Sequence, residues 1–270
     1  MESILQQFYK EINLSKYNYK EQKWNHIITN KDIPIYEMSQ ILFEFSHNIS
    51  ICNHNKIHLN PPEFDIVIPI NTLSFFEEVN ALWFCYSTKL NIMILCFTST
   101  YTNSLYLVDV NYLHQDLTDI NNSCKGFKIH GGFLSFYKGF RDQLIILIDK
   151  YYNNETKVFI SGYSLGGAIS TLATLDLYNK INNIKHYTFA SPRIFNIVGA
   201  NHFNSLNLLS YRIYNDSDIV PVLPFPIMLN SSLGIQDFMH IGEAIFFNNN
   251  IGNYYDNHSL SYLKYFKLIS

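Results

Sequence analysis

The stretch of residues 157–180 constrains the fold of this chain more than any other part of its sequence. It begins with Val158-Phe159-Ile160, a run of β-branched and aromatic residues typical of a strand buried on both faces of a parallel sheet. Apolar residues then recur at helical spacing over residues 168–178. Between the two patterns lies a glycine-containing turn, residues 162–166. The stretch therefore predicts a strand, a sharp turn and a helix.

The turn carries the pattern G-x-S-x-G, with Ser164 between Gly162 and Gly166. In a nucleophile elbow of this pattern the serine lies on a strained turn, and a Cβ at either glycine would collide with neighbouring backbone. The Ser164 hydroxyl would project above the sheet edge, and the backbone N–H of Leu165 would be free to hold an oxyanion. A purely structural glycine turn is the alternative. The strand before the motif and the helix after it favour the catalytic interpretation.

Length and composition indicate one large domain. The 270 residues with 47% hydrophobic content are enough for an α/β domain with a substantial core, which we expect to span residues 1–270. Charged residues make up only 15%, below the roughly 25% of an ordinary soluble domain, and the net charge is −3. Because a nucleic-acid partner requires a basic patch, we expect none.

The four cysteines, Cys52, Cys85, Cys96 and Cys124, have no C-x-x-C spacing. We interpret them as buried or free thiols of a reducing compartment rather than as disulfides or zinc ligands. The first residues lack the basic and apolar segments of a secretory signal. No apolar run approaches the roughly 18 residues that a membrane span needs. These observations predict a cytoplasmic location.

The N-terminal part of the chain is expected to be helical. Apolar residues recur at helical spacing up to about residue 55, and Pro34 marks a helix start. We expect residues 1–60 to form a helical cover packed on the sheet. Two strand-like runs follow, residues 81–87 and 92–97, and they predict a hairpin that feeds the sheet.

Helical and strand patterns alternate in the rest of the chain. A helix is expected over residues 133–152, strands over 184–190 and 208–214, and a terminal helix over 259–268. This alternation predicts the α/β class, with a mostly parallel central sheet flanked by helices.

A serine nucleophile needs a base to take its proton. On a sheet with this kind of elbow, the chain order is Ser, then Asp or Glu, then His. His240 and His258 both satisfy that order, and His258 stands where the terminal helix opens. His186 directly precedes a strand-like run, and His202 lies on a polar helical stretch. The residues alone leave His240 and His258 as candidates.

The base in turn needs a carboxylate to orient it. Asp216, Asp218 and Asp237 are available. Asp216 and Asp218 directly follow the strand expected over 208–214, at the strand end where ligand chemistry belongs in open α/β sheets. Ordinary turn chemistry also explains an Asp at such a position. The pattern does not choose between Asp216 and Asp218.

Five short motifs follow one another between about residues 92 and 262. They are Ile129–Phe133, Gly162–Ala168, Thr188–Arg193, Asn215–Pro221 and Asp256–Tyr262. In this order they resemble V-H-x-G-F, G-H-S-L-G-G-A, T-F-G-x-P-R, N-x-x-D-x-V-P and the terminal histidine segment of the class 3 lipases, the fungal-type triacylglycerol lipases. The first 80 or so residues match no family that we can name.

The resemblance implies the α/β-hydrolase fold and assigns a triad of Ser164, Asp218 and His258. It thereby selects Asp218 over Asp216, and His258 over His240. It implies a lipid ester substrate, transient contact with a membrane or lipid-droplet surface, and chemistry without a metal or organic cofactor. Triacylglycerol lipase, mono- or diacylglycerol lipase and phospholipase A1 activities are all compatible with it. The alternative is a catalytically silent relative that binds lipids or a protein partner.

The sequence departs from the family at three positions or stretches. Phe97-Thr98-Ser99-Thr100 stands where the family usually has F-R-G-T or F-R-G-S, Tyr163 stands in place of a histidine, and Phe195 in place of a glycine. Thr100 falls on the position that supplies an oxyanion contact in the family, beside Leu165. Losing one oxyanion donor typically costs about 10²- to 10³-fold in rate. The altered stretch is therefore the feature that favours a silent relative.

Residues 101–109 occupy the place of the family's lid, a short amphipathic helix that covers the serine and opens at a lipid surface. Leu105, Tyr106 and Val108 provide apolar side chains for such a helix. A fixed loop with these side chains in the core is the alternative.

Overall fold

The computed structural model describes residues 35–55, 63–74, 77–99, 113–117, 126–230 and 234–268. Its centre is a seven-stranded sheet with the strand order β1-β2-β3-β6-β7-β8-β11. The strands are β1 (Ile66–Ser74), β2 (Glu77–Ser87), β3 (Ile92–Phe97), β6 (Lys157–Tyr163), β7 (Ile184–Phe189), β8 (Leu209–Asn215) and β11 (Glu243–Phe247). The pairs β1–β2 and β2–β3 are antiparallel, and the pairs from β3 to β11 are parallel. The predicted mostly parallel sheet is confirmed.

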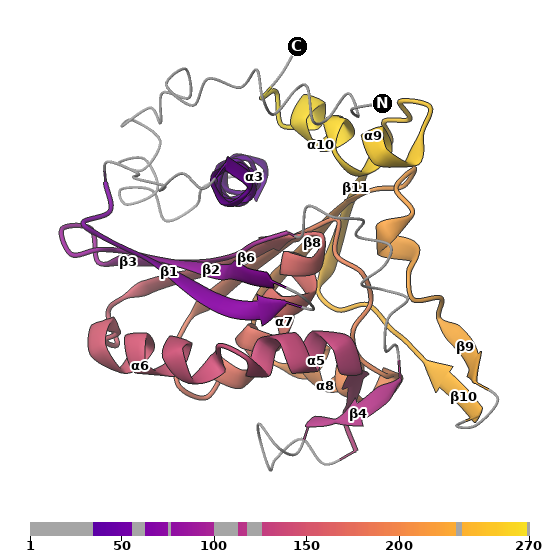
Figure 1. Ribbon diagram of the computed structural model, residues 1–270, viewed down its shortest axis with the longest axis horizontal. Coiled ribbons are helices and arrows are strands. Elements are labelled where there is room, and N and C mark those ends of the chain that lie inside the picture. The colour runs from indigo at the N-terminus through magenta and orange to yellow at the C-terminus, as the bar shows by residue number, and fades with distance from the viewer. Residues whose placement is uncertain are drawn as a thin grey trace.

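Helices cover both faces of the sheet (Figure 1). One face carries α5 (Gly131–Lys138), α6 (Arg141–Tyr151), α7 (Leu165–Leu177) and α8 (Ile197–Ser205). The other carries α3 (Ile35–Asn55), α9 (Tyr254–His258) and α10 (Leu260–Tyr265). The smaller elements are β4 (His114–Asp116), β5 (Lys128–His130), the 3₁₀ turn Val220–Val222, β9 (Ile227–Asn230) and β10 (Gly234–Asp237). The sheet is therefore the middle layer of three.

Strand β3 shows why the sheet lies inside the protein. All of its residues are buried, and successive side chains enter different cores. Met93, Leu95 and Phe97 join the core beneath α5 and α7, whereas Ile92, Ile94 and Cys96 join the core beneath α3. A strand with two buried faces needs a continuous apolar run, as this sequence has.

The predicted hairpin of residues 81–87 and 92–97 is confirmed as β2 and β3. The edge strand β1, which contains Pro69, was not predicted; a proline lacks the N–H that a central strand needs. Its position at the edge tolerates Pro69, and the register shifts between Ile70 and Asn71. The opposite edge strand, β11, was not predicted either.

The single helix expected over residues 133–152 is wrong, because the chain forms two helices that separate at Gly139 and Phe140. Phe140 leaves the helical region with φ −132° and ψ −2°, and its side chain enters the core. A Cβ on Gly139 would lie 2.3 Å from Thr72 Oγ1. The break therefore lets the chain pass close to β1 while it buries Phe140.

The N-terminal helix α3 packs on β2, β3, β6 and β7. Its contact side is apolar and includes Met38, Leu42, Phe43 and Phe45. The rest of the predicted cover, residues 1–34 and 56–60, lies outside the described residues. Across the described ranges, no helix has both the length and the apolar character needed to cross a bilayer.

Two of the cysteines can be placed. Cys85 and Cys96 are buried free thiols on β2 and β3, as predicted. Burial raises the pKa of Cys96 to about 11, with a smaller opposing effect from hydrogen bonds to Ser46 and Ser161. These thiols are therefore protonated core groups rather than reactive ones.

Candidate active site

Ser164 lies between β6 and α7 with φ 58° and ψ −123°, a backbone conformation that L-residues rarely adopt. The surrounding backbone holds this turn in place. The Ser164 N–H donates to the carbonyl of Phe189 on β7 at 2.8 Å, and Gly167 N–H donates to the Ser164 carbonyl at 2.9 Å. The serine therefore projects from the sheet edge on a strained turn, as the G-x-S-x-G pattern predicts.

The glycines of the motif are required by close backbone approach. A Cβ on Gly162 would lie 2.1 Å from the carbonyl oxygen of Gly166. A Cβ on Gly166 would lie 2.3 Å from the carbonyl oxygen of Phe97, at the end of β3. Any side chain at either position would displace the turn that carries Ser164.

The structure brings Ser164, His258 and Asp218 together. His258 Nε2 lies 2.9 Å from Ser164 Oγ, and His258 Nδ1 lies 2.8 Å from Asp218 Oδ2. The three residues come from the β6–α7 turn, the end of α9 and the loop after β8. Ser164 is fully buried, and the His258 side chain is 13% exposed. The geometry allows the imidazole to take the hydroxyl proton while the carboxylate orients the ring.

Asp218 is held by three groups. Besides His258, Tyr262 Oη donates to Oδ2 at 2.9 Å, and the Val220 N–H donates to Oδ1 at 3.0 Å. The Asp218 side chain is fully buried, so these partners replace its lost hydration. Burial, and then the nearby Asp218 charge, raise the pKa of Tyr262 well above its usual value. Tyr262 therefore stays protonated and able to donate.

Asp216 and Asp237, the other carboxylates, lie elsewhere. Asp216 is exposed and accepts a hydrogen bond from Asn248 Nδ2 at 3.2 Å. Asp237 Oδ2 accepts from the Ile197 N–H at 2.6 Å, at the start of α8. Of the three candidates, Asp218 is the one hydrogen-bonded to His258.

Two of the other histidines have structural partners. His240 Nε2 lies 2.7 Å from the Pro221 carbonyl oxygen, and His186 lies between Ser170 and Ser210 at 3.2 and 2.8 Å. Burial lowers the pKa of each imidazole to about 3, helped at His240 by two arginine charges. Both rings are therefore neutral near pH 7 and already hydrogen-bonded.

The terminal helix expected over residues 259–268 is the shorter α10, Leu260–Tyr265, and a separate helix, α9, precedes it. The chain breaks at Ser259, with φ −126° and ψ −73°, so His258 ends α9 instead of opening the terminal helix. Such a break between α9 and α10 carries no glycine or proline signal in the sequence. It places the imidazole of His258 over the sheet edge.

Two asparagines tie the end of β8 to α9, and the sequence interpretation gave them no role. Asn215 Nδ2 donates to the Asn257 carbonyl at 3.1 Å, and Asn257 Nδ2 donates to the Ser217 carbonyl at 3.1 Å. Asn215 N–H also donates to Tyr262 Oη at 2.9 Å. Both asparagines stand inside the motifs that carry Asp218 and His258, and that position is the signal that points to them.

Leu165 is the first residue of α7, where the helix's own hydrogen bonds leave the backbone N–H available. The adjacent end of β3 is fixed to β2, because the Thr98 N–H donates to the Ala81 carbonyl at 3.1 Å and Thr98 Oγ1 donates to the Asn80 carbonyl. Thr100 and the predicted lid, residues 101–109, lie outside the described residues. Phe195, where the family tends to have glycine, is a buried core residue.

No group of three or more His, Cys, Asp or Glu side chains gathers in the described ranges with the spacing of a metal site.

Comparisons with known proteins match this chain to lipases. A model of the family described as Lipase (class 3) matches residues 94–228. A lipase from Rhizomucor miehei is 33% identical over 132 residues, which are 46% of this chain and 34% of that protein. A secreted mono- and diacylglycerol lipase A from Penicillium cyclopium is 30% identical over 135 residues, which are 49% of this chain and 43% of that protein. Each match thus spans less than half of the relative's length.

A solved structure extends the likeness to most of the chain. The mono- and diacylglycerol lipase from Aspergillus oryzae superimposes with a TM-score of 0.63 and 18% identity, over 82% of this chain and 83% of that chain. At this identity the likeness shows a shared fold. The α/β-hydrolase fold expected from the motifs is therefore confirmed.

Proposed function

Because the chain belongs to the class 3 lipase family, we propose that it is a serine hydrolase that cleaves the acyl esters of lipids. The observation that carries the proposal is the hydrogen-bonded row of Ser164, His258 and Asp218. Ser164 Oγ lies 2.9 Å from His258 Nε2, and His258 Nδ1 lies 2.8 Å from Asp218 Oδ2. The strained backbone of Ser164 supports the same conclusion, since such strain concentrates at functional turns.

The proposed reaction follows from the atoms in this row. Ser164 Oγ attacks the ester carbonyl carbon while His258 Nε2 takes the hydroxyl proton, and Asp218 stabilises the imidazolium through Nδ1–H. The Leu165 N–H holds the oxyanion, and Thr100 is the second donor expected from the family resemblance. His258 then gives its proton to the leaving alcohol. Water then takes the place of the alcohol: it gives a proton to His258 and attacks the carbonyl carbon of the acyl-serine. His258 returns that proton to Ser164 Oγ, and the acid is released.

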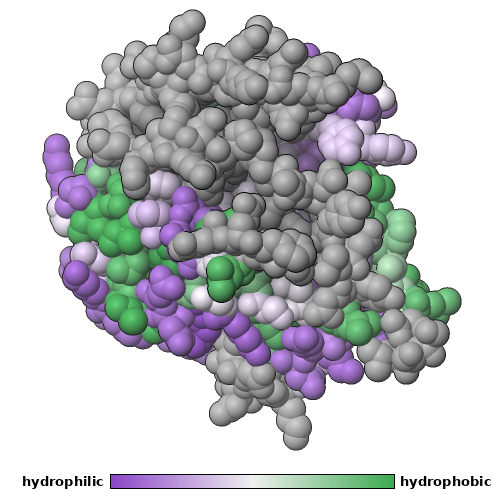
Figure 2. All heavy atoms as spheres, viewed as in Figure 1, coloured by the Kyte–Doolittle hydropathy of each residue, from purple (hydrophilic) through white to green (hydrophobic). Residues whose placement is uncertain are grey.

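Transient contact with a lipid surface is part of the proposal, and the loop after Asp218 supports it. The sequence from Pro221 to Gln236 contains no charged residue. Its described part includes exposed apolar side chains at Phe225, Ile227, Leu229 and Ile235. Figure 2 shows apolar surface at the edge where β9 and β10 lie. A hairpin that is apolar and carries no charge before Asp237 suits the surface of an acylglycerol aggregate.

The decisive experiment compares the wild type with Ser164→Ala on p-nitrophenyl esters of short and long chain length, below and above the micelle concentration. We expect hydrolysis by the wild type and a loss of several orders of magnitude in the variant. A fluorophosphonate should label the wild type at Ser164 and leave Ser164→Ala unlabelled. A wild type that neither hydrolyses these esters nor reacts would instead identify a silent lipid- or protein-binding relative.

The lipid class follows from a second assay. Triacylglycerol, diacylglycerol, monoacylglycerol and phosphatidylcholine emulsions, each at equal acyl concentration, separate a neutral-lipid lipase from a phospholipase A1. We propose neutral acylglycerols as the main substrates, because the hairpin has no basic side chain to meet a phosphate. Faster release of fatty acid from phosphatidylcholine would overturn that choice.

The cytoplasmic location stays a prediction. Several relatives are named as secreted proteins, so fractionation of the source cells and their medium is the appropriate test.

A further inference from the structure

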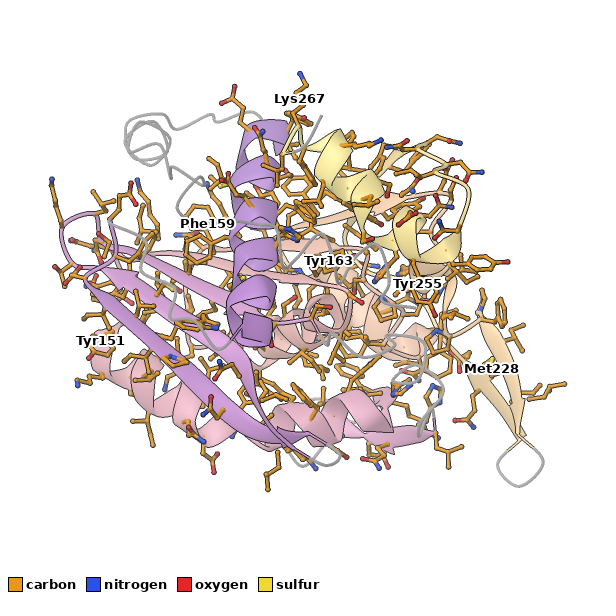
Figure 3. All side chains as sticks on the ribbon, turned by 45° about the horizontal axis from the view of Figure 1, so that its top comes forward. Tyr151, Phe159, Tyr163, Met228, Tyr255 and Lys267 are labelled. Atoms are coloured by element: carbon orange, nitrogen blue, oxygen red, sulfur yellow. The ribbon has the colours of Figure 1, made fainter. Side chains whose placement is uncertain are left out.

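We infer that Tyr163 is a positioning residue for His258, and that it connects the N-terminal helix α3 to the triad. This inference rests on the proposed hydrolase function. Tyr163 is the last residue of β6, directly before Ser164. Figure 3 shows it beside α3 and below the C-terminal helices. It stands where the family usually has histidine, so the contacts described below belong to this chain's own side chain.

Tyr163 makes two contacts with His258. Its hydroxyl donates a hydrogen bond to the backbone carbonyl of His258. Its ring stacks on the imidazole, with the ring centroids 5.0 Å apart and an interplanar angle of 25°. One side chain therefore restrains both the backbone and the ring plane of the base.

The hydroxyl contact matters because of where His258 lies. It is the last residue of α9, and carbonyls in the last turn of a helix have no partner in the helix's own hydrogen-bond pattern. The chain then turns away at Ser259. A donor from β6 at this carbonyl fixes the end of α9 to the strand that carries the nucleophile.

The stacking contact matters during the reaction. When His258 accepts the Ser164 proton, its ring becomes a cation, and the face of a tyrosine ring attracts a cation. The stacked ring also limits rotation about the bonds that aim Nε2 at Ser164 Oγ, a spacing of 2.9 Å. Both effects favour the protonated, correctly oriented imidazole.

The far side of Tyr163 is supported by α3. Phe43 of α3 lies edge-on to the Tyr163 ring, with centroids 5.8 Å apart and an angle of 82°. Tyr262 packs on it at 5.8 Å and 74°, and also stacks on Phe43 at 6.0 Å. Phe43 is 1% exposed. The family match begins at residue 94, so α3 lies outside it and yet supports the base.

The test separates positioning from folding by counting active sites. Fluorophosphonate titration gives the concentration of competent sites, and kcat and KM on a soluble short-chain ester are then expressed per titrated site. The variants are Tyr163→Phe, which keeps the ring, and Tyr163→Leu, which removes the ring and the hydroxyl. Tyr187→Phe is the matched control, a buried tyrosine on the neighbouring strand β7.

We expect Tyr163→Phe to lower kcat per site about tenfold, the usual weight of one hydrogen bond, and Tyr163→Leu to lower it about another tenfold. KM should stay within about twofold, and Tyr187→Phe should match the wild type. An unchanged kcat per site in Tyr163→Leu would overturn the inference. A wild type without labelling or hydrolysis would instead overturn the proposed function.

A double-mutant cycle tests the link to α3. Phe43→Leu alone should lower kcat per site about threefold, because the Tyr163 ring loses its edge contact. In the Tyr163→Leu background the same change should have no further effect on kcat. If kcat per site in the double variant falls by the product of the two single losses, Phe43 does not act through Tyr163.

Discussion

The nucleophile and the base of the proposed triad are held by different means. Ser164 is fixed by backbone packed against backbone, with glycines where a Cβ would lie 2.1–2.3 Å from a carbonyl oxygen. His258 is fixed by side chains: Asp218 on its ring, Tyr163 on its carbonyl, and the Asn215–Asn257 pair beneath it. The first arrangement tolerates no added atom. The second depends on individual hydrogen bonds, so its loss should be graded.

The largest effect should come from the buried carboxylate. In Asp218→Asn, the amide can donate to the imidazole and favour the wrong tautomer, so kcat should fall about 10³- to 10⁴-fold. Asp216→Asn, on the exposed neighbour, is the control and should keep wild-type kcat. Ester hydrolysis per titrated site measures both, and equal losses in the two variants would contradict the assignment of Asp218.

One added methyl group should disrupt the turn that carries Ser164, which backbone contacts hold in place. Gly162→Ala should lower the free energy of unfolding by about 2–4 kcal/mol, because its Cβ meets the Gly166 backbone. Gly126→Ala is the control: Gly126 has a positive φ, 84°, which Gly162 does not have, but a Cβ there would meet open space, so this variant should lose only about 1 kcal/mol. Urea denaturation measures both. Equal losses would mean that the collision with the Gly166 backbone costs no more than φ strain alone costs at Gly126.

The side-chain-held half should weaken in a graded way. Tyr262→Phe removes one of the three hydrogen bonds to Asp218 and should lower kcat about tenfold. Because His258 and Val220 still hold the carboxylate, we expect the number of titratable sites to stay the same. A loss of kcat as large as that of Asp218→Asn would show that removing single hydrogen bonds around His258 and Asp218 does not have graded effects.

The smallest effect should appear at the lipid surface. Leu229→Asp places a charge on the hairpin, where Leu229 is 79% exposed, and should lower hydrolysis of emulsified acylglycerol about fivefold. Hydrolysis of a soluble ester should be unchanged. Leu73→Asp, at an 82% exposed position on the edge strand β1, is the matched control. A similar loss in both variants would argue against the hairpin as the contact.

The sequence predicted local features better than those that depend on tertiary contacts. The β6–α7 elbow and the β2–β3 hairpin have strong signals within a few residues, and the structure contains both. The break at Gly139 depends on the approach of Thr72, about 67 residues earlier in the chain, which no local pattern records. The break at Ser259 likewise has no local turn signal.

The site residues also divide into those with a local sequence signal and those that depend on tertiary contacts. Chain order and motif resemblance pointed to Ser164, Asp218 and His258, which the structure brings within hydrogen-bonding distance. The supporting contacts of Tyr163 and Tyr262 were missed, because they join residues 95 and 44 positions apart in the chain. The roles of Thr100 and of residues 101–109, and the single-domain organisation, stay predictions.

The contact between Gly166 and Phe97 has a consequence for engineering this protein. Since the carbonyl of Phe97 occupies the space that a Gly166 side chain would take, the end of β3 and the nucleophile turn move as one piece. Thr98 is buried and its Oγ1 donates to the Asn80 carbonyl, so a library that varies this side chain also disturbs the end of β3 on which the elbow packs. An insertion or deletion in that segment shifts the serine itself. Loop grafting should therefore begin after residue 99 and leave the length before it unchanged.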